Sequence, residues 1–211
     1  YMFRGCSTLA SAPELPATTM EQGCYFGIFS ECTGLTSAPK LPANVLANNC
    51  YGWMFKGCSA LTSAPELPAT EMGSYCYNGM FANCTKLTSA PELPAKRLES
   101  NCYNCMFEGC TSLTSAPELP AKELIRNCYQ LMFKDCSKLR YVKALFTTSP
   151  SEETTKDWLS GVAASGTFVK SKNATWNVTG VHSIPKGWKI ATQSPVIYRD
   201  SCRFAFSLQA Y

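Results

Sequence analysis

Cysteines are the residues of this 211-residue chain that are best suited to chemistry, and there are 13 of them. A thiolate can be a nucleophile, a metal ligand or half of a disulfide, and spacing helps to separate these roles. Eleven of the cysteines fall in two columns, a column being a set of positions 26 residues apart: Cys6, Cys32, Cys58, Cys84, Cys110 and Cys136, and Cys24, Cys50, Cys76, Cys102 and Cys128. The spacings C-x7-C and C-x17-C are not those of zinc sites, so we expect no metal and no cofactor.

Two ladders of buried thiols explain these columns better than a metal or redox array does, because cysteine packs as a small hydrophobe. Cys105 forms a lone C-x-x-C with Cys102, but it stands where other units carry Gly27 or Trp53, which indicates drift at a variable position. Equivalent cysteines about 5 Å apart lie within reach of a disulfide. Parallel Cβ vectors make that torsion awkward, so we expect mostly free thiols.

The remaining ionisable residues give no catalytic constellation. His182 is the single histidine, and no serine or cysteine in a recognisable nucleophile context accompanies it, so a surface histidine is expected. Glutamates recur in one column, which also holds Lys40: Glu14, Glu66, Glu92 and Glu118. This column is either a binding feature repeated in each unit or a solvated acidic stripe in which Lys40 relieves repulsion. No glycine-rich phosphate loop is present, and we predict that the chain is not an enzyme.

Charge excludes a nucleic-acid groove along the repeats. Residues 1–136 hold 9 Lys/Arg and 11 Asp/Glu, a net charge of 9 − 11 = −2, whereas residues 137–211 hold 10 and 4, a net charge of +6. A surface that follows phosphates needs clustered Lys and Arg along its length. No run of about 18 apolar residues is present, so we expect no membrane insertion.

A 26-residue repeat must position all of these columns. The stretch LTSAPELPA occupies residues 61–69, 87–95 and 113–121, with near-copies at 9–17 and 35–43. A strict period of this length predicts a solenoid of about six coils, in which each unit buries its apolar residues against its neighbours. The first coil is truncated, and we expect that the chain's true start lies before Tyr1.

Within a unit, the spacing predicts one or two short helical turns and one very short parallel strand. Leu46, Cys50, Met54 and Cys58 lie four residues apart, as on one face of a helix. Residues 61–64 are the strand candidate, and Pro65 must end it because proline cannot donate to a ladder.

These residues carry a resemblance to a known family. The segments MFKGCSALTSAPELPA (54–69) and MFEGCTSLTSAPELPA (106–121) resemble the BspA-type leucine-rich repeats of bacterial surface proteins, common in Bacteroides-like bacteria. The resemblance covers about residues 1–146. It implies an α/β solenoid, a right-handed leucine-rich-repeat superhelix. It also implies a secreted or cell-surface, outer-membrane-associated protein that acts in adhesion or protein binding.

The pattern breaks after Leu139, and the rest of the chain is expected to close the solenoid. We divide the chain into a solenoid at 1–146, a C-terminal cap at 147–190, and a linker, tail or further domain at 191–211. In the cap, a helix is expected to begin at Ser149 as N-cap and to end at Gly161. Residues 166–171 and 187–191 read as strands, and the apolar cover is expected from Trp158, Phe168, Trp176 and Trp188.

Two functions fit these features. The first is a non-catalytic adhesion or protein-interaction module whose partner is a protein or glycan on a host or bacterial surface. Its expected site, on the strand face, comprises Thr36, Ser37, Lys40, Thr62, Ser63, Glu66, Thr88, Ser89, Glu92, Thr114, Ser115 and Glu118. The second is a spacer rod that presents a neighbouring domain or forms part of a larger surface or phage-like assembly. The sequence leaves the ligand and the oligomeric state open.

Overall fold

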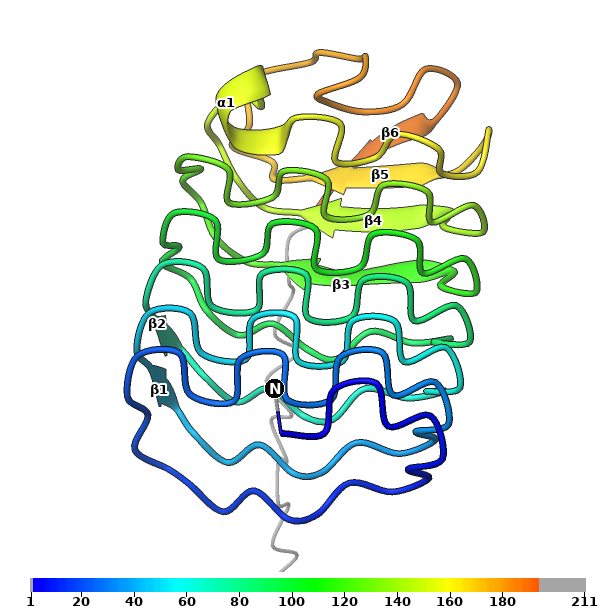
Figure 1. The fold of residues 1–211 in the computed structure, drawn as a ribbon. Coiled ribbons are helices and arrows are strands. Elements are labelled where there is room, and N and C mark those ends of the chain that lie inside the picture. The colour runs from blue at the N-terminus through cyan, green and yellow to red at the C-terminus, as the bar shows by residue number, and fades with distance from the viewer. Residues whose placement is uncertain (1, 194–211) are drawn as a thin grey trace, which may run out of the picture.

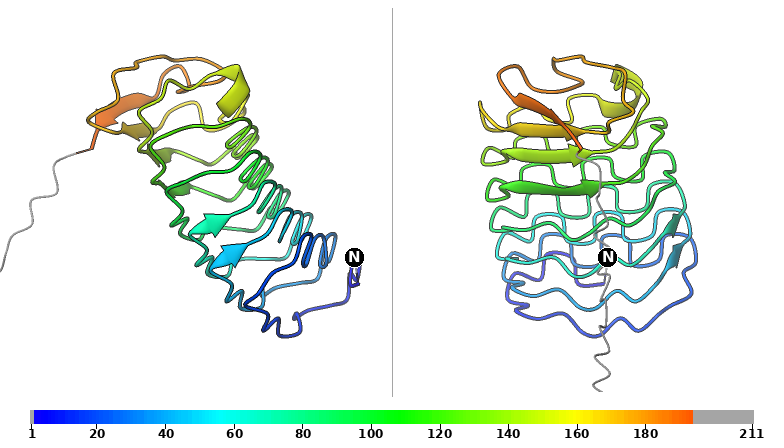
Figure 2. Two further views of the ribbon diagram at one scale, coloured as in Figure 1. Left: turned by 90° about the vertical axis from the view of Figure 1, so that its left-hand side faces the viewer. Right: turned by 180° about the vertical axis from the view of Figure 1, so that it is seen from behind.

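A computed structural model describes residues 2–193 of the chain. These residues form a parallel β-solenoid of about six turns with coils of about 26 residues (Figure 1). Successive coils stack along one axis, with the N-terminal coil at one end and strands β5 (Thr167–Lys170) and β6 (Lys189–Thr192) at the other (Figure 2). The predicted solenoid and its period are therefore confirmed.

Strands are short and parallel. β1 (Val45–Leu46) pairs with β2 (Glu71–Met72), and a four-stranded sheet has the order β3-β4-β5-β6. Its members are β3 (Ser115–Leu119), β4 (Tyr141–Ala144), β5 (Thr167–Lys170) and β6 (Lys189–Thr192). The strands expected at 166–171 and 187–191 are confirmed as β5 and β6. The strand candidate at 61–64 is reduced to an isolated bridge between Ser63 and Ser89.

Proline explains why the ladder is so short in the repeats. Each repeat carries what we call a proline segment, in which two prolines lack an N–H. The proline segments are residues 9–17, 35–43, 61–69, 87–95 and 113–121. The longer pairing of β3 with β4 forms where the chain opposite Pro117 reads Tyr141–Ala144 and contains no proline. It still includes a register shift between Ser115 and Glu118.

The prediction of helical turns in the repeats is wrong. The segments 23–32, 49–58, 75–84, 101–110 and 127–136, which we call turn segments, are chains of tight turns whose trace is a square wave (Figure 1). Left-handed residues recur along them, for example Asn49 (φ 62°), Tyr51 (φ 60°) and Trp53 (φ 55°). Such φ values are incompatible with a continuous right-handed helix.

Hydrogen bonds along each turn segment alternate between two directions. Within the coil, the N–H of Met54 donates to the carbonyl of Tyr51 at 3.2 Å. Towards the next coil, the N–H of Trp53 donates to Asn78 at 2.7 Å and that of Phe55 to Met80 at 2.9 Å. Because the inter-coil bonds repeat along the whole segment, the turn segments tie neighbouring coils together.

Aromatic columns fill the core between the coils. Phe29, Phe55, Phe81, Phe107 and Phe133 are fully buried, and neighbouring rings stack with centroids 5.5–5.8 Å apart. The tyrosine column Tyr25, Tyr51, Tyr77, Tyr103 and Tyr129 stacks at 5.9–6.0 Å. Stacking of this kind adds to the free energy of burying each ring. The core is thus one continuous structure along the solenoid axis.

The solenoid continues past Leu139 into the segment that we assigned to the cap. β4, β5 and β6 extend the sheet, and the N–H of Phe133 donates to Trp158 at 2.9 Å as in the repeats. All four predicted cover residues, Trp158, Phe168, Trp176 and Trp188, are buried. The boundary between solenoid and cap stays a prediction, and residues 194–211 of the tail, with Cys202, lie outside the described residues.

The expected helix start is shifted and its length is wrong. α1 comprises Glu152–Thr155, with Ser151 as N-cap and a capping box between Ser151 and Thr154. Gly161 does not close this helix, since α1 ends at Thr155. Gly161 instead has φ +74°, like Gly57 and Gly109 in the repeats. The segment 157–161 has therefore adopted the conformation of a turn segment.

Candidate functional site

The twelve predicted site residues lie on one side of the solenoid, and all of them are exposed. Each of these coils contributes a threonine and a serine near the start of its proline segment and a charged residue near the centre of that segment. Some hydroxyls are already engaged, since Thr36 Oγ1 donates to the carbonyl of Ala10 at 3.1 Å and Thr88 Oγ1 to that of Thr62 at 3.3 Å. The structure thus assembles these residues into a common surface, which we call the proline face.

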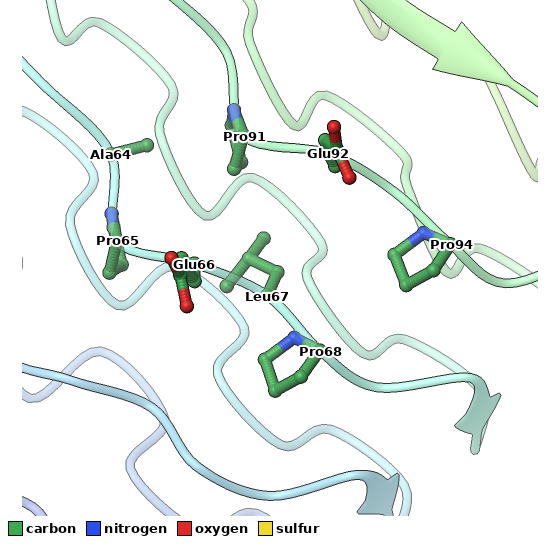
Figure 3. A pocket seen from close by; sticks show the side chains of 8 residues that line it. All are labelled: Ala64, Pro65, Glu66, Leu67, Pro68, Pro91, Glu92 and Pro94. Carbon is green, nitrogen blue, oxygen red and sulfur yellow. The ribbon is translucent and has the colours of Figure 1, made fainter.

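Grooves between neighbouring proline segments hollow this face. The largest of three, of about 600 Å³, is lined by Ala64 to Pro68 of one coil and by Pro91, Glu92 and Pro94 of the next (Figure 3). We call it the middle groove. Equivalent grooves of about 480 and 450 Å³ lie on either side, one involving Lys40 and the other Glu118. Sequence reasoning named the charged residues but missed the proline walls, although the proline columns were a visible signal.

The backbone on the proline face is open. No backbone hydrogen bond joins residues 65–69 to residues 91–95 in the structure, in contrast to the bonded turn segments. The amides of Glu66 and Glu92 belong to this unpaired set, and both side chains are exposed. Unpaired N–H and C=O groups at a surface are available to water or to a partner chain.

The carboxylates of the proline face differ in their surroundings. Glu118 forms an ion pair with Lys143 at 2.6 Å, across the pairing of β3 with β4. Glu66 and Glu92 have no ion pair with any described residue. Among the carboxylates that line the three grooves, the uncompensated negative charges are therefore those of Glu66 and Glu92.

The buried thiols of the first ladder form hydrogen bonds within the core. Each buried thiol of the first column donates to the carbonyl of a phenylalanine in the coil before it, as Cys58 Sγ does to Phe29 at 3.1 Å and Cys84 Sγ to Phe55 at 3.1 Å. Burial raises the pKa of Cys58 to about 12 and that of Cys84 well above its ordinary value. Neutral, hydrogen-bonded thiols in a core are inert rather than nucleophilic.

Cys50 and Cys76 form a distinct pair in the second column. The Cys50 thiol donates to the carbonyl of Glu21 at 3.2 Å and the Cys76 thiol to that of Ala47 at 2.9 Å. The interaction with Cys76 lowers the pKa of Cys50 to about 7, and the interaction with Cys50, together with burial, raises the pKa of Cys76. Both side chains are fully buried, which keeps reagents from them. Burial also raises the pKa of Cys105 to about 12, so that the C-x-x-C at 102–105 holds no activated thiolate.

The single histidine is held by hydrogen bonds beside α1. His182 is half-buried, its Nδ1 accepts the N–H of Asp157 at 3.2 Å, and its carbonyl accepts the hydroxyl of Thr155 at 2.6 Å. These contacts tie His182 to the region around α1. Among residues 2–193, no group of three or more His, Cys, Asp or Glu side chains is arranged to hold a metal ion.

Comparisons of the chain with protein-family models, with curated proteins and with solved structures found no match. Among the described residues, no helix has the length and apolar character needed to cross a membrane.

Proposed function

We propose that this chain is a non-catalytic binding module that acts in adhesion or protein interaction at a cell surface. The observation that carries the proposal is the proline face, where exposed hydroxyls and carboxylates and three similar grooves recur along one side of a stacked core. Near-identical shallow sites in a row suit an extended contact in which avidity compensates for modest affinity at each site. The partner is a protein or glycan of a host or bacterial surface.

The repeat sequence supports the cellular setting. The motif MF-x-G-C-[ST]-x-L-T-S-A-P resembles BspA-type leucine-rich repeats, which implies secretion or display at the outer membrane. We therefore propose a place for the chain among leucine-rich-repeat proteins. The support is the order of residues in the repeat, since the coil is built from turns and short parallel strands.

A capture experiment tests the proposal. The chain is immobilised and exposed to labelled host-surface and bacterial-surface extracts, beside a variant in which Thr36, Thr62, Thr88 and Thr114 are replaced by lysine. The matched control places four lysines in the column Thr33, Ser59, Thr85 and Thr111, outside the proline segments. We expect partners retained by the native chain and the control, and lost from the first variant. If neither the native chain nor the control retains a partner at micromolar concentration, the proposal is contradicted.

A spacer rod is the second candidate, and the continuous core favours it. Stacked phenylalanine and tyrosine columns, together with inter-coil hydrogen bonds in every turn segment, give a stiff element whose length grows with coil number. In that case the extracts yield no partner, and the function lies in the distance that the rod spans.

A further inference from the structure

The three grooves of the proline face are lined by similar residues but differ in charge. The groove lined by residues 38–42 pairs Lys40 with Glu66, so its two central charges are opposite. The groove that includes Glu118 contains one carboxylate already neutralised by Lys143 at 2.6 Å. The middle groove contains Glu66 and Glu92, neither of which has an ion pair with a described residue. Negative charge is therefore concentrated in the middle groove.

The walls of the middle groove are apolar and rigid. The groove is lined by four prolines and a leucine: Pro65, Pro68, Pro91, Pro94 and Leu67. The side chains of Glu66 and Glu92 lie among them (Figure 3). Proline rings have a fixed φ and lose little conformational entropy when a partner binds. A ligand that fits must offer an apolar stem for the rings and a cationic head for the carboxylates.

Arginine and lysine side chains have this construction, because a chain of methylene groups carries their charge. Glu66 and Glu92 line the same groove from adjacent coils, and a planar guanidinium has five N–H donors with which to bind carboxylates on two sides. An ammonium is a smaller point charge and bridges two acceptors less well. A bare metal ion fits poorly, since only two carboxylates are present and the walls offer it no ligands.

We propose that the middle groove binds an arginine side chain of an extended basic peptide segment. This inference rests on the proposed function, because it names the chemistry of the partner that the proline face recognises. The open backbone of residues 65–69 and 91–95 offers the same segment hydrogen-bonding groups beside the groove.

A titration followed by nuclear magnetic resonance tests the inference. Acetylated, amidated triarginine is added to the ¹⁵N-labelled chain at low ionic strength, and trilysine and triglutamate serve as comparison peptides. The amides of Glu66 and Glu92 are the reporters within the groove, since its prolines have none. We expect their signals to shift with triarginine, less with trilysine and not with triglutamate. Shifts spread over all acidic residues, or none at millimolar peptide, overturn the inference.

Matched variants separate the groove from overall charge. Glu66→Gln with Glu92→Gln removes two charges from the middle groove, whereas Glu14→Gln with Glu123→Gln removes two exposed charges elsewhere. Glutamine keeps the size of glutamate, so both variants are expected to fold. We expect roughly three- to tenfold weaker triarginine binding for the first pair, since each exposed ion pair contributes little. Equal weakening in the two double variants contradicts the inference.

A gain-of-function variant provides a second test. Lys40→Glu places a second carboxylate in the groove that already contains Glu66. Triarginine binding is expected to strengthen roughly two- to fivefold, with new shifts at residues 40 and 41. Unchanged binding and unchanged shifts at these residues count against the inference.

The failure of this inference is distinguishable from the failure of the proposed function. If the capture experiment retains a partner that the threonine-to-lysine variant loses, while triarginine leaves Glu66 and Glu92 unshifted, the proline face binds a partner of different chemistry. That result overturns the inference and leaves the proposed function in place.

Discussion

Individual side chains in the core are not all satisfied. The hydroxyls of Tyr77 and Tyr103 are buried and have no hydrogen-bond partner in the structure, whereas Tyr51 reaches the sulfur of Met20 at 4.0 Å. An unpaired buried hydroxyl loses its hydration without compensation. The tyrosine column therefore gains its stability from ring stacking rather than from its oxygens.

Tyr103→Phe is accordingly expected to stabilise the protein. The ring and its stacking partners remain, and the unpaired hydroxyl is removed, so the free energy of unfolding should rise by about 1 kcal/mol. Urea unfolding followed by circular dichroism measures this change. Tyr51→Phe is the control and should gain less, because its hydroxyl has a weak partner. If Tyr103→Phe instead lowers the free energy of unfolding by more than about 1 kcal/mol, the hydroxyl of Tyr103 must form a hydrogen bond in the folded protein.

Buried thiols are expected to make the protein less stable at alkaline pH. The folded pKa of Cys58 is about 12, against an ordinary value of 9.0. Below pH 9 both states hold the proton and the stability is fully present. Between pH 9 and 12 the unfolded thiol ionises while the folded one does not, so stability falls as the pH rises, by up to about 1.4 kcal/mol per pH unit per thiol. Urea midpoints at pH 8 and 10.5 measure this, and equal midpoints would show that the thiols are not buried.

At the scale of the element, the turn segment replaces the helix that spacing alone suggests. Its square wave returns to the core every four residues, so that Cys50, Met54 and Cys58 are all buried. An α-helix of 3.6 residues per turn produces nearly the same spacing. The distinguishing signal lies in the positions with positive φ, which carry Asn49, Gly57, Asn83 and Gly109 among others. Asparagine and glycine are the residues that adopt this conformation most easily.

Gly79 tests the geometry of the turn segment. It has φ +56°, and a Cβ added there would lie 2.6 Å from Cδ1 of Trp53. Gly79→Ala should therefore lower the free energy of unfolding by about 1 kcal/mol because of the positive φ. The clash of the new Cβ with Trp53 should lower it by about 1 kcal/mol or more in addition. Gly23→Ala, with φ +72° and open space, should show only the backbone effect. Thermal unfolding compares the two, and the excess should vanish when Trp53 is also replaced by alanine. Equal effects in both glycine variants would place Trp53 elsewhere.

Sequence could predict the stacking but not the course of each coil. The period of the phenylalanine and cysteine columns indicates the solenoid. The proline columns indicate where pairing is weak, but the prediction that proline ends the strand is wrong for β3, which pairs with β4 on both sides of Pro117. The exposed residues of the proline face are the polar residues of LTSAPELPA, namely its threonine, serine and glutamate. The grooves could not be predicted, because they depend on how adjacent proline segments pack, and the ion pair between Glu118 and Lys143 depends on the register of β3 with β4.

At the scale of the whole molecule, the solenoid should behave as a one-dimensional stack. Deleting residues 61–86 removes one period and joins Ala60 to Leu87, which restores the repeat pattern. The shortened chain should fold with a lower free energy of unfolding, because one interface between coils is lost. Deleting residues 61–84 instead shifts every column by two positions and should prevent folding. Circular dichroism and urea unfolding distinguish the two, and equal stability of both deletions would refute stacking in register.

The two sides of each coil differ in their backbone hydrogen bonding. Turn segments are hydrogen-bonded to their neighbours, and proline segments are open to a partner. Amide hydrogen exchange of the 211-residue chain tests this claim most directly. We predict strong protection at Phe55, Gly79 and Phe81, whose N–H groups donate to the next coil at 2.7–2.9 Å, and exchange close to the unprotected rate at Glu66 and Glu92. Protection at Glu66 and Glu92 equal to that at Phe55 and Phe81 would contradict the account.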